Sequence, residues 1–364
     1  MKSRSRNIII AFLVLFFTMS IIPSVLAKTR GSYLVDFIYS NEIEGEGFKN
    51  SILAEDTMIP EPTAYALDIL SGFGINPHEI SDLQSFLEDH IADMIDSDTV
   101  SLYDLYFLLK SLEILHYQID ASLENNIYRY LNQTQQSGGG FSISNSSSIS
   151  SLSSTYFAYQ IYLLIEPSFP NITLHRNWIL SCNNSDGGYG GNQSLSSTIY
   201  NTFNAVFLID NLGTIDDLAD KNQTLNYITS FYIDNPSDIN NVGGFLPDTT
   251  ANYPLLSSTY YCIMVVSIID NSILNDYFTV NWILSRQNFQ DGGFADLTEG
   301  TNQYTSSVIS SFYAFKTLSK FSALSKLSTE IWMVEFDYMI LVILMASIGA
   351  VAGLGVFIWK RRRI

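Results

Sequence analysis

A glycine-rich turn that ends in an aromatic residue recurs along the chain and limits its fold more than any other feature. The last three intervals between copies, and half of the first, are each about fifty residues. This period is too long for a coiled coil and fits a repeat of helix pairs, whose units must stack to bury a shared core. The aromatic residues of the five copies are Phe48, Phe141, Tyr189, Phe245 and Phe294.

Each turn separates two different helical patterns. In residues 177–190 and 281–294, an amphipathic pattern ends in glycines that allow a positive φ, and an aromatic residue follows. A second pattern begins about fourteen residues later with a hydroxyl, an aromatic and a small residue, as in Thr155-Tyr156-Phe157-Ala158. This second pattern is apolar nearly all round, which is typical of buried inner helices.

The interval from Phe48 to Phe141 is nearly double the others, and we interpret its middle as a degenerate unit. Asp96, Ser97 and Asp98 take the place of the glycines there. Six units result, and the chain is expected to be all-α. Six inner helices, beginning near residues 60, 99, 150, 195, 254 and 303, should close into an α/α toroid ringed by six outer ones.

Residues 1–27 have the layout of a secretory signal peptide. Lys2, Arg4 and Arg6 precede an apolar run at 8–22, and small or compact residues follow at 25–27. An uncleaved N-terminal anchor is the alternative. In either case, we expect the segment from residue 28 onward to be exported.

Residues 339–359 form an uncharged apolar stretch of the length that a helix needs to cross about 30 Å of hydrocarbon. A basic tail at residues 360–364 follows, and basic residues favour the cytoplasmic side. The sequence predicts a single-pass type I protein of the cell membrane. Its toroid, residues 28–320, lies outside the cell and is joined to the span by a juxtamembrane segment at 321–338.

The predicted exported part is strongly acidic. Seven of the 18 Lys and Arg lie in the two ends, which leaves 11 against 36 Asp and Glu, a net charge of −25. Such a surface repels nucleic acid and diphosphates and favours cations or neutral ligands. Cys182 and Cys262 would lie in an oxidising compartment and could pair, but their places in the repeat argue against a disulfide. Six Asn-X-Ser/Thr sequons permit glycosylation without indicating it.

The alternation of outer helix, (D)GGF/Y turn and inner helix resembles the prenyltransferase and squalene-oxidocyclase repeat, over roughly residues 31–320. The resemblance implies the toroid fold. It leaves the function open, since one fold hosts unrelated activities.

Protein prenyltransferases hold zinc through an Asp and a Cys at the start of one inner helix and a His at the start of a later one. Here the residues beside the repeat hydroxyl are small, polar or aromatic, so no metal or other cofactor is expected. Those before it are Ser154, Asn201, Ser258 and Ser310, and those after it are Tyr156, Phe203, Tyr260 and Phe312. The histidines fall elsewhere and are interpreted as surface or helix-packing residues: His78, His90, His116 and His175.

Cyclases of the squalene type use a DxDD motif to protonate an alkene. The nearest match begins at Asp248 and lacks the paired acids, so we interpret Asp248 as a loop residue. Glycan hydrolases and lyases on (α/α)6 barrels need two carboxyls about 5 to 9.5 Å apart. Acids near loop ends are Glu55, Glu61, Asp96, Asp98, Asp248, Asp296 and Glu299. Asp186 and Asp291 precede the glycine turn alike, which is typical of turn residues.

The sequence therefore favours a toroid that binds a ligand or partner without catalysis. The alternatives are a prenyltransferase- or terpene-cyclase-like enzyme acting on isoprenoid or lipid substrates, and then a glycan hydrolase or lyase. The expected partners are membrane lipid, contacted by the C-terminal helix, and an apolar small molecule, a glycan or a surface protein. The candidate cavity residues, at the starts of the inner helices, are Tyr156, Asn201, Ser258, Tyr260, Ser310 and Phe312.

Overall fold

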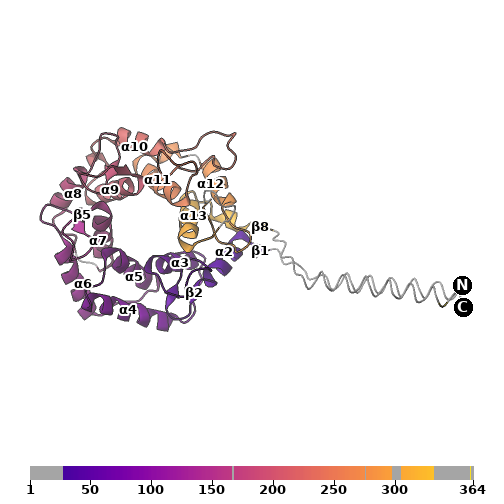
Figure 1. Cartoon of the computed structure of the whole chain (residues 1–364), viewed down its shortest axis with the longest axis horizontal. Coiled ribbons are helices and arrows are strands. Elements are labelled where there is room, and N and C mark those ends of the chain that lie inside the picture. Colours follow the sequence, from indigo (N-terminus) through magenta and orange to yellow (C-terminus); the bar gives the residue numbers. More distant parts are fainter. Residues whose placement is uncertain (1–27, 166–167, 275, 297–304, 332–360, 362–364) are drawn as a thin grey trace. The chain divides into compact units, whose positions relative to one another are not determined.

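The computed structural model describes residues 28–165, 168–274, 276–296, 305–331 and residue 361. Residues 30–329 form one compact unit, a ring of helices in two layers (Figure 1). The inner layer is α3 (Pro60–Gly72), α5 (Leu102–Ile114), α7 (Leu152–Leu164), α9 (Ile199–Leu212), α11 (Leu256–Ile269) and α13 (Val308–Lys320). The outer layer is α2 (Arg30–Tyr39), α4 (Ile80–Asp96), α6 (Ala121–Thr134), α8 (Ile172–Leu180), α10 (Lys221–Thr229) and α12 (Asp276–Ser285).

Each inner helix packs against the next, and α13 packs against α3, so the ring closes. The inner helices bury several faces, as in α11, whose buried residues include Ser258, Thr259, Cys262 and Val265. The outer helices α4 and α6 are amphipathic, and α6 buries only a stripe that begins at Leu123. The predicted toroid of six inner and six outer helices is confirmed for the described residues, and every inner helix begins within five residues of its predicted start.

The turn between an outer and an inner helix is tied to the inner helix by a repeated hydrogen bond. The backbone N–H of the turn aromatic donates to the hydroxyl that opens the inner-helix motif, at 2.9–3.0 Å. This bond explains why a hydroxyl follows each of these turn aromatics, 13 to 17 residues later. The pairs are Phe48 with Thr63, Phe141 with Thr155, Tyr189 with Thr202, Phe245 with Thr259, and Phe294 with Ser311.

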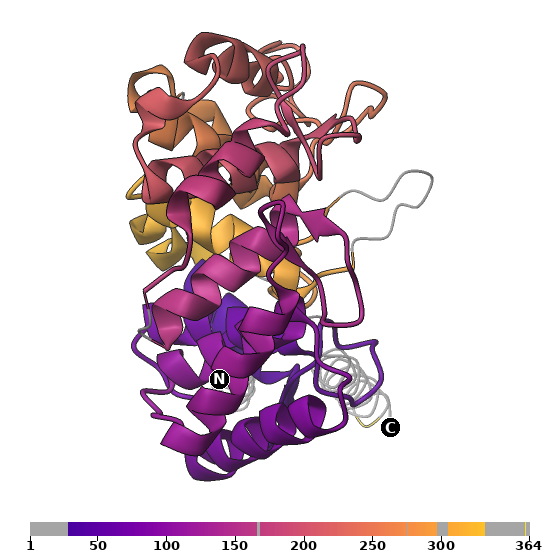
Figure 2. The ribbon, with the colours of Figure 1, turned by 90° about the vertical axis from the view of Figure 1, so that its left-hand side faces the viewer.

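Three of these connections form short antiparallel hairpins, and the long connections gather on one side of the ring, to the right in Figure 2. The hairpins are β2 (Glu42–Ile43) with β3 (Gly47–Phe48), β4 (Phe141–Ser142) with β5 (Ser150–Ser151), and β6 (Tyr189–Gly190) with β7 (Ser197–Thr198). The inner helices begin on this side, because each connection leads directly into one of them.

The turn glycines also let each turn approach the next outer helix. Gly243 has φ 96°, and a Cβ there would lie 2.4 Å from the backbone of Phe278 in α12. Gly292 has φ 88°, and a Cβ there would lie 2.3 Å from the backbone of Tyr33 in α2, so this close approach is one of the contacts that join the last repeat to the first. The degenerate turn uses Asp98, at φ 58°, in the same left-handed region, as predicted.

Three short 3-10 helices complete the toroid: η1 (Ile215–Asp217), η2 (Asn271–Ile273) and η3 (Leu324–Ser328). The compact unit runs to residue 329 and includes η3, whose Leu327 is buried. It therefore differs from the expected boundary at 320, because η3 packs against α2 and α13.

The second compact unit comprises residues 1–29 and 330–364. Within it, β1 (Lys28–Thr29) pairs with β8 (Glu330–Ile331). The predicted signal peptide at 1–27 and the predicted span at 339–359 lie outside the described residues, as does the basic tail except residue 361. Among the residues that are described, no helix has the length and apolarity needed to cross a membrane. Cys182 and Cys262 are both buried and unpaired.

Candidate functional site

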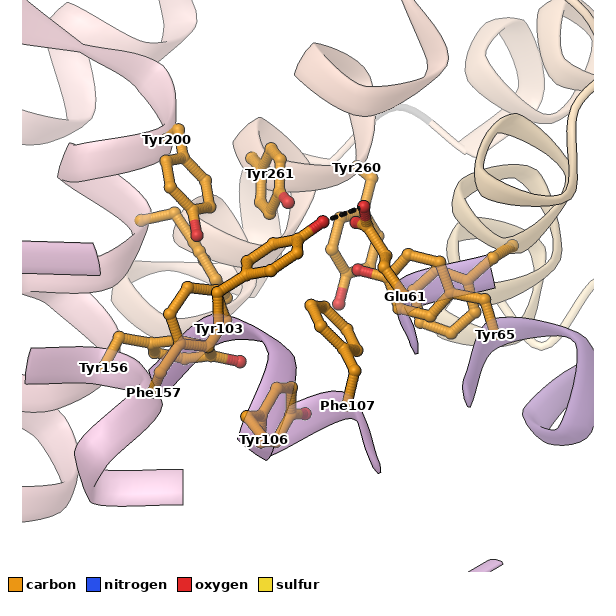
Figure 3. Close-up of a pocket in the computed structure, with 12 residues that line it drawn as sticks. Glu61, Tyr65, Tyr103, Tyr106, Phe107, Tyr156, Phe157, Tyr200, Tyr260 and Tyr261 are labelled. Carbon is orange, nitrogen blue, oxygen red and sulfur yellow. Dashed lines mark hydrogen bonds between the residues drawn. The ribbon is translucent and has the colours of Figure 1, made fainter. Parts of the chain in front are cut away.

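A small cavity of ≈ 80 Å³ lies inside the barrel, at the end where the inner helices begin. Glu61, Tyr103 and Tyr200 each occupy the second position of their inner helix and face the cavity. Figure 3 shows these side chains converging from different helices. The residues that line the cavity are Glu61, Tyr65, Tyr103, Tyr106, Phe107, Tyr156, Phe157, Tyr200, Phe203, Tyr260, Tyr261 and Phe312.

The rings form a closed belt around the barrel. Successive partners have ring centroids 3.6 to 6.3 Å apart, within or close to the range of favourable aromatic pairs. All six inner helices contribute, so the belt fastens the helices to one another across the barrel. In order, the belt runs Tyr65, Phe107, Phe157, Tyr156, Phe203, Tyr260, Phe312 and back to Tyr65.

Glu61 is the one carboxylic acid among the described residues that line the cavity. The hydroxyl of Tyr103 reaches across from α5 and donates a hydrogen bond to its carboxylate (Figure 3). Burial raises the pKa of Glu61 above its usual value, and hydrogen bonds from Tyr103 and Tyr65 act in the opposite direction. The carboxylate is thus held in place by tyrosines rather than by a cation.

The tyrosine hydroxyls in and beside the belt stay protonated at neutral pH. Burial raises the pKa of Tyr103 and Tyr260, and it raises the pKa of Tyr313 to about 12. The hydroxyls of Tyr261 and Tyr313 are hydrogen-bonded at 2.8 Å. The cavity therefore presents aromatic rings, neutral hydroxyls and one carboxylate.

The structure separates the six candidate residues into two groups. Tyr156, Tyr260 and Phe312 lie in the cavity lining. The other three are not among the lining residues, because they sit beside the turns that lead into their helices. Asn201 donates to Thr198 Oγ1 at 2.9 Å, Ser258 to the carbonyl of Phe245 at 2.6 Å, and Ser310 to Asp296 Oδ2 at 3.3 Å.

Several lining residues were missed because the inner helices are apolar nearly all round, so their sequence pattern does not show which face points inward. A usable signal was the repeated aromatic at a spacing of three or four residues, as in Tyr103 with Phe107 and Tyr200 with Phe203. Glu61 was identified only as an acid near a loop end.

Of the acids considered for glycan chemistry that the structure describes, Glu61 alone lines the cavity. Asp296 accepts the N–H of Leu256 at 2.7 Å and thereby caps α11 from the neighbouring repeat. Asp248 is exposed and accepts bonds from Thr250 and the N–H of residue 251, which lower its pKa. It is a loop residue, as predicted. Glu299 lies outside the described residues.

Asp186 and Asp291 are turn residues, as predicted. Asp186 accepts the N–H of Gly188 at 3.0 Å and the hydroxyl of Ser197 at 2.7 Å. Asp291 makes the same two contacts, at the same distances, two repeats later in the ring. The repeated geometry places both carboxylates in the framework of the turn, away from the cavity.

The histidines are surface or packing residues, as predicted. His175 has no exposed surface, accepts the N–H of Gly140 on Nδ1 at 2.9 Å and stacks on Phe141. Burial lowers its pKa to about 4. His78 is exposed and pairs with Glu42. Within the described ranges, no group of three or more His, Cys, Asp or Glu is placed to hold a metal ion.

The sequence profile of the family described as prenyltransferase alpha-alpha toroid domain matches residues 75–176 and 171–338. The fold is similar to that of protein geranylgeranyltransferase-I from Candida albicans in complex with GGPP. That match has a TM-score of 0.58 and 17% identity, and it covers 77% of this chain and 90% of the other.

The fold is also similar to that of the type II terpene cyclase MstE from Scytonema, with a TM-score of 0.51 and 12% identity over 82% of this chain and 96% of that one. A variant of that cyclase in complex with geranylgeranyl dihydroxybenzoate, its substrate, matches with the same TM-score, identity and coverage. No curated protein sequence matches the chain. At these identities the similarity shows the fold alone.

Proposed function

The chain belongs to the prenyltransferase alpha-alpha toroid domain family, and we propose that it is a membrane-anchored toroid that binds a small ligand in its barrel without transforming it. The observation that carries this proposal is the size and lining of the cavity. A volume of ≈ 80 Å³ is well below the roughly 300 to 1,000 Å³ of pockets that bury drug-sized ligands. The aromatic belt occupies the space that a long isoprenoid chain would need.

The placement outside the cell is part of the same proposal and rests on the ends of the sequence. Residues 1–27 have the layout of an export signal, and residues 339–359 have the length and apolarity of a membrane span followed by basic residues. Membrane lipid would contact that span. A toroid held there would meet small molecules, glycans and surface proteins outside the cell.

A second candidate is a terpene-cyclase-like enzyme, and Glu61 favours it. A carboxylic acid whose pKa is raised by burial, facing an aromatic cavity, is a candidate proton donor to an alkene. The same group would recover its proton when the product loses one, so the reaction would be an isomerisation. This reading requires the belt to open, because the cavity is too small for a polyprenyl substrate as it stands.

The glycan hydrolase or lyase reading has weaker support. Such enzymes need two carboxyl groups that flank the substrate, and among the described lining residues only Glu61 supplies one. Asp296 is engaged in capping α11.

The proposal is tested by turnover assays on the full-length chain in maltoside detergent. Geranylgeranyl diphosphate and squalene serve as the charged and neutral isoprenoids, and the products are separated by mass spectrometry. We expect neither diphosphate release nor cyclised product. Product formation that Glu61→Gln abolishes and Asp248→Asn preserves would overturn the proposal in favour of the cyclase.

A further inference from the structure

We propose that the cavity binds the head group of a small alkylammonium cation, with the Glu61 carboxylate as its counter-charge and the aromatic belt as its cage. This inference rests on the proposed function, a ligand-binding toroid, and names the chemical class of the ligand. It follows from the charge, the ring faces and the size of the cavity.

The charge in the cavity is negative. Glu61 lines it, and no lysine or arginine is among the described lining residues. Lys316 lies beside the belt, with its Nζ 5.7 Å from the centre of the Phe312 ring. Lys316 is already paired with both oxygens of Asp68, at 3.0 and 3.1 Å, so these two charges offset one another. The remaining charge at Glu61 favours a cation and repels phosphates and carboxylates.

Glu61 retains room for a further donor. An ionised carboxylate has about four lone-pair sites, and the hydroxyls of Tyr103 and Tyr65 account for two of them. A primary ammonium has three N–H donors and can use the free sites together with tyrosine oxygens. A hydrogen bond between an ammonium and a carboxylate is charge-assisted and roughly twice as strong as a neutral one.

The aromatic rings of the lining can attract the alkylammonium head group, including the carbon atoms bonded to its nitrogen. A cation within about 6 Å of an aromatic face is attracted by the quadrupole of the ring, and the attraction grows when water is excluded. Tyr65 and Phe312 are stacked, with centroids 3.6 Å apart, and Tyr103 stands edge-on to Phe107 and Phe157. The lining thus combines stacked and edge-on rings, and seven of these rings are tyrosines that carry hydroxyl groups.

The size of the cavity selects a narrow head group. Its ≈ 80 Å³ is about half the roughly 150 Å³ of an engineered apolar cavity that binds benzene. An ammonium on an unbranched chain fits such a space better than a bulky polycyclic or polyprenyl group. The rest of the ligand would extend from the cavity toward the side where the inner helices begin, because Glu61 lies in the first turn of α3.

The test is isothermal titration calorimetry on the full-length chain in maltoside detergent, with n-butylammonium and its neutral counterpart 1-butanol as probes. We expect n-butylammonium to bind one per chain and at least about tenfold more tightly than 1-butanol. Glu61→Gln should remove this preference, and Asp248→Asn, which makes the same change in net charge at an exposed loop, should leave affinity within about twofold.

Tyr103→Phe keeps the ring of the cage and removes the hydroxyl that holds Glu61. It should weaken binding of the cation by several-fold, and it replaces Glu61→Gln as the test variant if Glu61→Gln does not fold. Equal binding of both probes by the unmodified chain, unchanged cation affinity in Glu61→Gln, or no binding of n-butylammonium would each overturn the inference. None of these results bears on turnover, so the proposed function would stand or fall separately, on the isoprenoid assays.

Discussion

Acidification is expected to weaken the fold through one buried histidine. His175 lies in α8 with no exposed surface, and its Nδ1 accepts the N–H of Gly140 in the neighbouring turn. That contact requires an unprotonated Nδ1, since two N–H groups cannot bond to each other. Burial accordingly lowers the pKa of His175 to about 4, from 6.5 in an unfolded chain.

The sign and size of the effect follow from linkage. Because the unfolded chain takes up the proton first, the stabilisation is fully present above about pH 6.5 and is lost as the pH falls toward 4. The gap is about 2.5 pH units, and each is worth about 1.4 kcal/mol, so the full effect is about 3.5 kcal/mol. About 3 kcal/mol of it is lost by pH 4, where folded His175 is half protonated.

The assay is urea unfolding of the full-length chain at pH 7 and at pH 4, followed by circular dichroism. His175→Gln removes the titrating group, so it should be less stable than the wild type at pH 7 and lose about 3 kcal/mol less on acidification. His116→Asn, at an exposed position with φ 54°, is the matched control and should behave as the wild type does. Equal acid-induced losses in the wild type and His175→Gln would refute the reasoning.

Three further outcomes are expected. Thr155→Val removes the hydroxyl that accepts the Phe141 N–H, and should lower the free energy of unfolding in urea by about 1 to 3 kcal/mol. Thr57→Val, at an exposed position, should leave it almost unchanged. Equal losses in the two variants would contradict the role given to the repeat hydroxyl. In Gly243→Ala the added methyl group meets the backbone of α12 at a positive φ, so the free energy of unfolding should fall by at least about 1 kcal/mol. In Gly138→Ala the methyl group meets nothing within 4 Å, so stability should not change. An unchanged stability of Gly243→Ala would contradict the close packing of this turn on α12. Because burial raises the pKa of Glu61, n-butylammonium affinity should fall as the pH drops through that pKa, and the fall should vanish in Glu61→Gln; a pH-independent affinity in the wild type would count against Glu61 as counter-charge.

The architecture could be predicted because the repeat is enforced by local chemistry. A glycine turn needs a residue that tolerates positive φ, an aromatic residue whose backbone N–H donates a hydrogen bond, and a hydroxyl that accepts it. These three requirements recur along the chain and can be recognised in the sequence. Even the degenerate unit could be found, since Asp98 adopts the conformation that glycine supplies elsewhere. The boundary at residue 320 was harder to place, because Leu327 reaches the core from a short 3-10 helix with no periodic pattern.

The site was only half predictable. Tyr156, Tyr260 and Phe312 follow the repeat hydroxyl and do face the cavity. Ser258 and Ser310 precede the hydroxyl by one position, which turns them toward the adjoining turn, where they bond a carbonyl and a carboxylate. A sequence that is apolar on all sides of a helix cannot reveal this difference, because the direction of each side chain is set by how the six helices pack.

The most direct test of the central claim is native mass spectrometry of the full-length chain, purified from its native source in maltoside detergent with no ligand added. The account predicts one small nitrogen-containing molecule per chain, retained by Asp248→Asn and lost from Glu61→Gln. A bound isoprenoid in its place, or a molecule that Glu61→Gln keeps as firmly as the wild type, would contradict it.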